Sequence, residues 1–305
     1  MRRRTVLAAL AVGLAGCSGG RESESTPTVT PVGVPEDTGG DNGPLSPTDS
    51  RFDADTPTPE GVRLFHQLSG DERMAVEPNR ELFTAERSSA QIRLRNDRDT
   101  ALYVSSGWGL RKYTGSRWVR ILAPHINRGG LTSVDPNSVW RRRHNITNVF
   151  SLPVLGPGLY ARIEDVRVDN GEIGGESVRL GALFEVSGTD YEVRPAGSPR
   201  IDGDVATLVR SPLAERTVVF ERVDDDDPES AVPVVPEVVG AIPMFRDTIP
   251  LLSEVRSVRI NTASAPLVFQ YLSEAPVRAV DVGPETRLEH DGTVFTVRTV
   301  DSEDR

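Results

Sequence analysis

The residue types that most often carry catalysis or bind metals are scattered through this sequence rather than grouped. The four histidines, His66, His125, His144 and His290, do not lie at metal-ligand spacing, and the single cysteine, Cys17, cannot by itself build a thiolate zinc site. The sequence has no His-Glu-x-x-His motif, no Gly-x-Ser-x-Gly elbow and no glycine-rich phosphate loop. We therefore predict no catalytic residue, no metal, no cofactor and no enzymatic activity, and we interpret the histidines as surface or turn residues.

Two acidic clusters contain the oxygen ligands that calcium prefers. One is the run at residues 224–227, and the other consists of Asp165, Asp169, Asn170 and Glu172. The first lacks the spaced ligands and the turn glycine of an EF-hand loop. We interpret both clusters as solvated charge in loops, with cation binding as the alternative.

A basic run stands out in this acidic chain. Arg141, Arg142 and Arg143 are candidates for contact with an anionic partner or a lipid headgroup. In a strand, Arg141 and Arg143 face one way and Arg142 the other, so only part of the run acts together. Residues 145–147 read Asn-Ile-Thr, a glycosylation sequon, which makes Asn145 a candidate for a glycan.

Three tryptophans, Trp108, Trp118 and Trp140, are large enough to dominate either a binding surface or a core. An aromatic surface for sugars or proteins is one interpretation. In a β-sandwich of this size, a place in the core is favoured.

The first residues have the features of an export signal. Arginines at residues 2–4 precede an apolar stretch at residues 6–15, which is shorter than the ~20 residues that cross a bilayer. Residues 14–17, Leu-Ala-Gly-Cys, resemble the lipobox of prokaryotic lipoproteins, and the paired arginines resemble a twin-arginine export signal. This resemblance implies cleavage before Cys17, a lipid on its sulfur, and anchoring to the outer face of the cytoplasmic membrane. The alternative is a cysteine without a lipid after a cleaved signal.

The charge of the chain bears on its environment and partners. It carries 45 Asp and Glu residues against 35 Lys and Arg residues, and Lys112 is the only lysine. Loss of residues 1–16, with their three arginines, would move the net charge from −10 to −13. Such a composition resembles proteins of salt-loving archaea, in which salt screens the self-repulsion of an acidic surface, so we expect the fold to depend on salt. A bias toward arginine codons is the alternative. The acidic body argues against a nucleic-acid partner.

Composition and pattern divide the chain into four parts. Gly, Ser, Thr, Pro, Asp and Glu dominate residues 18–60, and so few apolar residues cannot offset the entropy cost of ordering. We therefore predict a signal peptide at residues 1–16, a lipidated cysteine and disordered stalk at 17–60, an Ig-like β-sandwich at 61–195, and a smaller α+β domain at 196–305.

The sandwich is predicted from strand-like runs. These lie at residues 90–95, 100–104, 108–113, 117–121 and 138–146. The Leu-x-Pro-Gly-x-Tyr element that ends at Tyr160 resembles the tyrosine corner of Greek-key sandwiches, in which the phenol bonds to the backbone a few residues upstream.

The order of these features resembles bacterial Ig-like domains of surface lipoproteins over residues 74–187. The features are Arg95-Asn96 at a strand end, Lys112-Tyr113 with Gly115 and Trp118, the element that ends at Tyr160, and a closing strand at 182–186. The resemblance implies a mainly β fold with an Ig-like antiparallel sandwich, in which we assign Tyr160 and Trp118 structural roles. Residues 165–177 depart from the pattern and lengthen the last hairpin.

The smaller unit begins after Pro195, Gly197 and Pro199. Strands are predicted at residues 205–209, 217–223, 255–260 and 277–282, a helix at 236–254 that prolines must interrupt, a short helix at 266–274, and a hairpin at 286–299. The hairpin turns at Asp291-Gly292, a dipeptide typical of tight turns.

These features favour a non-enzymatic, membrane-tethered surface protein that binds or displays a partner, either a surface protein or a glycan. An accessory or solute-binding component of a transporter is an alternative, although that class needs two lobes in which strands and helices alternate. An extracytoplasmic enzyme of unfamiliar type is another.

Overall fold

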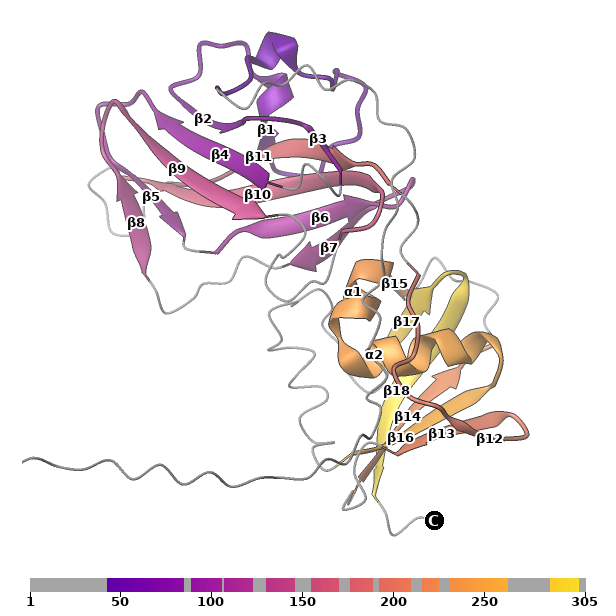
Figure 1. The fold of residues 1–305 in the computed structure, drawn as a ribbon. Helices are drawn as coiled ribbons and strands as arrows, with labels where there is room; N and C mark the ends of the chain where they lie inside the picture. The colour runs from indigo at the N-terminus through magenta and orange to yellow at the C-terminus, as the bar shows by residue number, and fades with distance from the viewer. Residues whose placement is uncertain are drawn as a thin grey trace, which may run out of the picture.

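The computed structural model describes residues 43–84, 89–105, 107–122, 130–145, 155–169, 176–188, 192–209, 216–224, 231–262 and 286–301. In these residues the protein is mainly β, with a β-sandwich followed by a smaller α+β unit (Figure 1), which confirms the predicted fold class. The predicted signal peptide, Cys17 and the stalk as far as residue 42 lie outside the described residues.

Two sheets form the sandwich. The larger contains β1 (Arg63–Leu64), β3 (Leu82–Phe83), β5 (Leu102–Ser105), β6 (Gly109–Tyr113), β7 (Trp118–Leu122), β8 (Leu131–Val134), β10 (Gly158–Val168) and β11 (Glu176–Val186). The smaller contains β2 (Met74–Pro78), β4 (Ser89–Asn96) and β9 (Ser138–Asn145), all antiparallel. Two short 3-10 helices, η1 (Pro47–Asp49) and η2 (Phe65–Gln67), precede the main strands.

The strand order is that of an Ig-like Greek key. β4 pairs with β9, whereas β5, the next strand along the chain, lies in the other sheet against β10. β10 and β11 form one long hairpin, from Gly158 opposite Val186 to Val168 opposite Glu176, which confirms the lengthened last hairpin. β3 adds to β11 in parallel.

A buried charged layer lies next to the apolar core between the sheets. Arg162 pairs with Glu164 two residues further along β10, and both side chains are almost fully buried. Arg142 reaches across from β9, its Nη1 4.0 Å from Oε2 of Glu164. The guanidinium of Arg162 also lies 4.4 Å from the ring centroid of Trp108. Burial lowers the pKa of Arg162 although Glu164 opposes this. Arg142 and Glu164 thus connect the two sheets through charge at the edge of the apolar core.

The smaller unit is one mixed sheet with helices packed against it. Its strand order is β12 (Arg200–Asp202), β13 (Val205–Val209), β16 (Ser257–Thr262), β14 (Arg216–Arg222), β18 (Thr293–Asp301), β17 (Arg287–His290) and β15 (Val232–Pro233). The predicted helix is broken at its prolines into α1 (Pro236–Ala241), α2 (Pro243–Thr248) and η4 (Ile249–Ser253), as expected. The hairpin turn at Asp291-Gly292 is confirmed, with φ of 50° and 77°. The elements predicted at residues 266–274 and 277–282 lie outside the described residues.

The apolar core continues across the predicted boundary between the two units. One buried cluster joins Trp108 and Phe184 of the sandwich to Val238, Phe245 and Phe295 of the smaller unit. The change of pattern near residues 195–199 therefore marks a change of architecture along the chain, while the packing remains continuous.

The structure differs from the predicted stalk at residues 43–60. Ser50 donates its hydroxyl to Oε1 of Glu81 at 2.7 Å, and Arg51 donates its amide to Oε2 at 2.8 Å. Phe52 packs against an apolar cluster on the sandwich. Burial raises the pKa of Glu81, and the two donors only partly oppose this. The mean composition of this segment is polar, but one aromatic anchor and a buried acceptor on a folded sheet hold it in place.

Candidate functional site

The Leu-x-Pro-Gly-x-Tyr element builds the turn that enters β10. The hydroxyl of Tyr160 lies 2.6 Å from the carbonyl oxygen of Gly156, and its fully buried ring stacks on Phe184 with centroids 5.3 Å apart. Gly158 has a φ of +140°, and a Cβ there would lie 3.1 Å from Cε of Lys112. Glycine at this position therefore permits the turn and leaves room for the lysine.

A carboxylate from the smaller unit completes this corner. Glu237 is the second residue of α1 and is fully buried. Its Oε1 lies 2.7 Å from Nζ of Lys112, 3.0 Å from the amide of Gly156 and 2.7 Å from the hydroxyl of Tyr160. One oxygen thus gathers three donors from the sandwich, and Figure 1 shows α1 at the end of the smaller unit that faces β6 and β7.

The phenol of Tyr160 is shared between the two units. A phenol has one hydrogen to donate, yet the Gly156 carbonyl oxygen and the Glu237 carboxylate both lie within hydrogen-bond distance. Burial, and then the negative charge of Glu237, raise the pKa of Tyr160 well above its usual value. The phenol therefore stays protonated and acts as a donor throughout the ordinary pH range.

Lys112 supplies the positive charge of this interface. It lies opposite Tyr160 in the register of β6 and β10, with Nζ 5.5 Å from the Tyr160 ring centroid. The side chains of Lys112 and Glu237 are 14% and 0% exposed. Removal of one partner would leave the other charge buried and unpaired. Breaking such a pair therefore lowers the free energy of unfolding by about 3–5 kcal/mol. We call Lys112, Tyr160 and Glu237 the junction triad.

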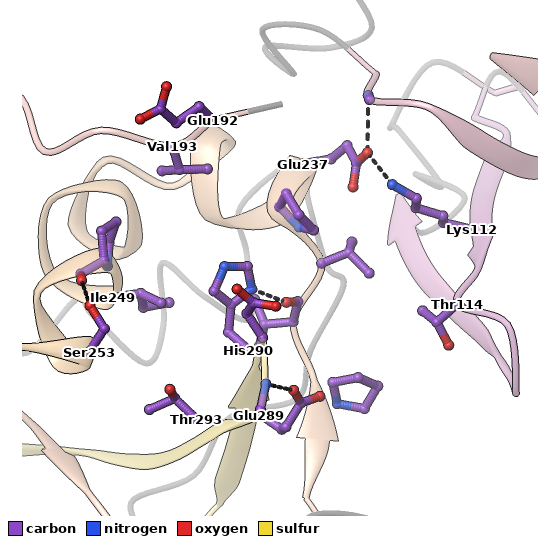
Figure 2. Close-up of a pocket in the computed structure, with 18 of the residues that line it drawn as sticks. Lys112, Thr114, Glu192, Val193, Glu237, Ile249, Ser253, Glu289, His290 and Thr293 are labelled. Carbon is purple, nitrogen blue, oxygen red and sulfur yellow. Dashed lines mark hydrogen bonds and ion pairs between the residues drawn. The ribbon is translucent and has the colours of Figure 1, made fainter. Parts of the chain in front are cut away.

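Beside the junction triad the two units enclose a cleft of about 920 Å³ (Figure 2). One wall is the β6–β7 hairpin with the turn before β10. The opposite wall combines the β15–α1 connection, η4 and the β17–β18 hairpin. Side chains that line it include Lys112, Thr114, Ser116, Arg117, Glu192, Val193, Glu237, Ile249, Ser253, Glu289, His290, Asp291 and Thr293.

His290 presents a fixed ring nitrogen in this cleft. Its Nδ1 lies 2.6 Å from the carbonyl oxygen of Val234. A carbonyl only accepts, so Nδ1 carries the hydrogen, and in the neutral ring Nε2 is left as an acceptor. Next to it, Oε1 of Glu289 accepts the amide of Gly292 at 2.7 Å, which fixes the carboxylate on the hairpin. With Asp291 and Glu192 also in the lining, acceptors dominate this side of the cleft.

Trp118 lies apart from this site. It packs with a cluster of Val62, Ile163 and Leu183, and its ring centroid is 5.4 Å from that of Tyr113. In β10, Ile163 alternates with the residues that face the junction, so Trp118 packs on the other face of the sheet. Trp108 is buried in the main core, and Trp140 is partly buried against the core between the sheets.

The remaining predicted site residues are not gathered by the described fold. Cys17, His125, Asn170, Glu172 and residues 225–227 lie outside the described residues, and so does the sequon after Asn145. Asn145 and His144 end β9, but their side chains are not described. Across the described ranges, no three His, Cys, Asp or Glu side chains are grouped to hold a metal ion.

Two further predicted residues have local roles in packing or charge pairing. His66 packs near Phe52 with ring centroids 6.0 Å apart, and burial lowers its pKa although the charge of Asp53 opposes this. Asp224 is exposed and pairs with Arg256 at 3.4 Å.

Sequence reasoning missed the roles of Lys112, Glu237 and His290. Lys112 carried a signal, because a single lysine among so many arginines implies a position that an ammonium suits better. Glu237 follows Pro236 in a run of valines, a pattern that placed a carboxylate at the start of a helix but gave no sign of burial. No neighbouring residue in the sequence marks His290 as a site residue, since the carbonyl that orients its ring belongs to Val234, 56 residues earlier in the connection between β15 and α1.

Comparisons with known proteins add little to this geometry. No family model matches the chain, and no curated protein matches it. Among solved structures, the X-ray structure of the Northeast Structural Genomics Consortium target SoR45 is 14% identical, and the match covers 32% of this chain and 68% of that chain with a TM-score of 0.23. A likeness of this extent carries no argument about function. Within the described residues, no helix is long and apolar enough to cross a membrane.

We predict that Tyr160→Phe destabilises the protein by about 1–3 kcal/mol, because buried acceptors lose their donor. Tyr113→Phe is the matched control, since its hydroxyl donates to Gly115 at an exposed turn where water can replace it. Chemical denaturation of both full-length variants at high salt would measure the difference. Equal stabilities would contradict a structural role for the Tyr160 hydroxyl.

We predict strong coupling in a double-mutant cycle of Lys112→Met and Glu237→Gln. Each single change leaves a buried partner uncompensated and should cost about 3–5 kcal/mol, while the double variant should lose far less than the sum. The same cycle on Glu192 and Arg194, an exposed pair, should give only about 0–1 kcal/mol of coupling. Additive losses for Lys112 and Glu237 would contradict the junction triad.

Proposed function

We propose that this protein is an exported lipoprotein that holds a non-enzymatic binding module outside the cell, and that the cleft beside the junction triad is its ligand site. The observation that carries the proposal is the construction of this cleft. Its walls come from two units whose relative position is set by a buried ion pair at its edge. A site fixed in this way loses little entropy when a ligand binds.

The tether supports a position close to the membrane. With residues 43–60 held against the sandwich, about 25 residues remain between Cys17 and the body. Even fully extended, 25 residues reach no more than about 90 Å. The lipid would therefore keep the body within about that distance of the surface that carries its partners.

The chemistry of the cleft suits a ligand rich in hydrogen-bond donors. Nε2 of His290 and the carboxylates of Glu289, Asp291 and Glu192 are acceptors, and they lie near Ser and Thr hydroxyls. Vicinal hydroxyl groups of a neutral sugar can donate to such a set. A glycan of the cell surface is therefore the ligand class that we propose.

Cys17→Ser should move the protein from the membrane fraction to the medium or leave it unprocessed, because Cys17 would carry the lipid anchor. Fractionation and mass measurement of the N-terminus would check this. The neighbouring change Ser18→Ala should leave the protein cleaved and membrane-bound. A Cys17→Ser protein that stays cleaved and in the membrane would contradict the lipoprotein assignment.

The cleft is tested with the full chain carrying Cys17→Ser and a panel of neutral oligosaccharides, by calorimetry at high salt. We expect His290→Ala to weaken binding about tenfold, the usual effect of losing one hydrogen-bond partner of the ligand. His66→Ala, which removes a histidine outside the cleft lining, should change affinity little. No binding by any oligosaccharide, or equal loss in both variants, would contradict this site.

A further inference from the structure

The outer face of the three-stranded sheet carries a group of arginines that the proposed function does not use. The register of β4 and β9 sets Arg93 opposite Arg141 and Gln91 opposite Arg143. Side chains alternate along a strand, and Ile92 faces the core, so these arginines share the outer face. We call Arg93, Arg141 and Arg143 the arginine face.

The three arginines lie close together in the register of the two strands. Side chains directly opposite in an antiparallel pair have Cβ atoms about 4.5–5.5 Å apart, and diagonal neighbours lie about 7–8 Å apart. Arg141 and Arg143 are exposed, while Arg93 is half-buried. Arg142 alternates inward to the charged layer of the sandwich and is not part of this face.

A bound anion would stabilise this arrangement of like charges. Like charges directly opposite in a sheet are destabilising, and Arg93 and Arg141 are such a pair. Glu77 lies opposite Arg93 on the neighbouring strand β2, but its carboxylate pairs with Arg95. Among the described residues no ion pair reaches Arg93, Arg141 or Arg143. The neighbouring Arg95 is different, because Glu77 and Asp97 neutralise it.

Arg93 adds a second observation at the same place. Its Nε is buried and has no hydrogen-bond partner among the described residues. A buried guanidinium N–H without an acceptor costs free energy, and an acceptor with several oxygens would remove that cost. The planar fork of arginine binds phosphate oxygens in pairs, so three neighbouring guanidinium groups match a phosphate-bearing surface.

We propose that the arginine face docks the body onto the phosphate headgroups of anionic lipids. A membrane is near this face only if the protein carries the proposed lipid anchor, so the inference rests on the proposed function. The body as a whole is acidic and is repelled by an anionic membrane, so docking through the arginine face favours one orientation. At molar salt the screening length falls to about 3 Å, and direct arginine–phosphate hydrogen bonds are the contacts that persist.

The test uses the chain carrying Cys17→Ser without residues 1–16, so that neither a lipid nor the apolar signal binds the vesicles, and failure of the anchor and failure of this face are distinguished. Flotation with phosphatidylglycerol vesicles and with phosphatidylcholine vesicles measures binding at a salt concentration where circular dichroism shows the folded protein. We expect binding to the anionic vesicles alone.

The combined change Arg93→Gln, Arg141→Gln and Arg143→Gln should weaken this binding about a hundredfold, at roughly fivefold for each arginine. The matched control replaces three exposed arginines elsewhere, Arg63, Arg200 and Arg259, by glutamine and changes the net charge equally. It should retain affinity within about twofold if position rather than total charge decides binding.

Three results would overturn the proposal. Equal losses in the two triple variants would show that overall charge, not this face, governs binding. Binding to neither kind of vesicle would remove the lipid surface as the partner. Saturable binding of inorganic phosphate that needs the three arginines, without binding to vesicles, would make the face a site for a free anion instead.

Discussion

One buried carboxylate oxygen, Oε1 of Glu237, holds the two units in a fixed relation. It collects Lys112, Tyr160 and the amide of Gly156 from the sandwich while its own backbone belongs to the first helix of the smaller unit. Burial of a carboxylate is costly unless charge and hydrogen bonds compensate for it. The three donors meet only when the corner before β10 and the start of α1 are both formed. The relative position of the two cleft walls depends on the formation of both elements.

The interior shows why polar contacts fix this relation. Apolar packing runs without interruption from the sandwich into the smaller unit, and such packing tolerates sliding more readily than directed bonds do. Glu237 and Lys112 join the two units directly, whereas Glu164 pairs with Arg162 on its own strand and is approached by Arg142 from the opposite sheet. On β10, Arg162 and Glu164 lie between Tyr160, which belongs to one apolar cluster, and Val166, which belongs to the next. Both buried pairs are costly to break, because removal of one partner leaves the other charge buried and unpaired.

Much of the fold could be predicted because short sequence patterns determine these elements locally. Alternation placed β4, the Asp-Gly dipeptide placed the final turn, and prolines placed the breaks in the helix. The tyrosine corner was visible because a six-residue motif contains both the phenol and its backbone acceptor. Two-residue strands such as β1 and β3 were not predicted, since their only support is parallel pairing with the distant β11. No periodicity exists over two residues.

The site was less predictable because its residues come together through long-range contacts. Glu237 bonds to Tyr160 across 77 positions and to Lys112 across 125. Residues 43–60 were read as a stalk for the same reason, since their acceptor, Glu81, lies about thirty positions away. The composition of a segment indicates whether that segment could fold alone. It contains no information about a surface elsewhere in the chain against which the segment packs.

The choice of cation at each buried position follows from shape. Guanidinium planes lie near tryptophan rings, with Arg162 4.4 Å from the Trp108 centroid and Arg142 4.6 Å from that of Trp140. Flat, weakly hydrated groups suit those places. At the junction the cation must pass beside Gly158, where even a Cβ would approach the lysine chain at 3.1 Å, and end on one carboxylate oxygen. A compact ammonium on a flexible stem meets both conditions, whereas a planar fork needs more width. The single lysine of an arginine-rich chain is therefore found where the two units join.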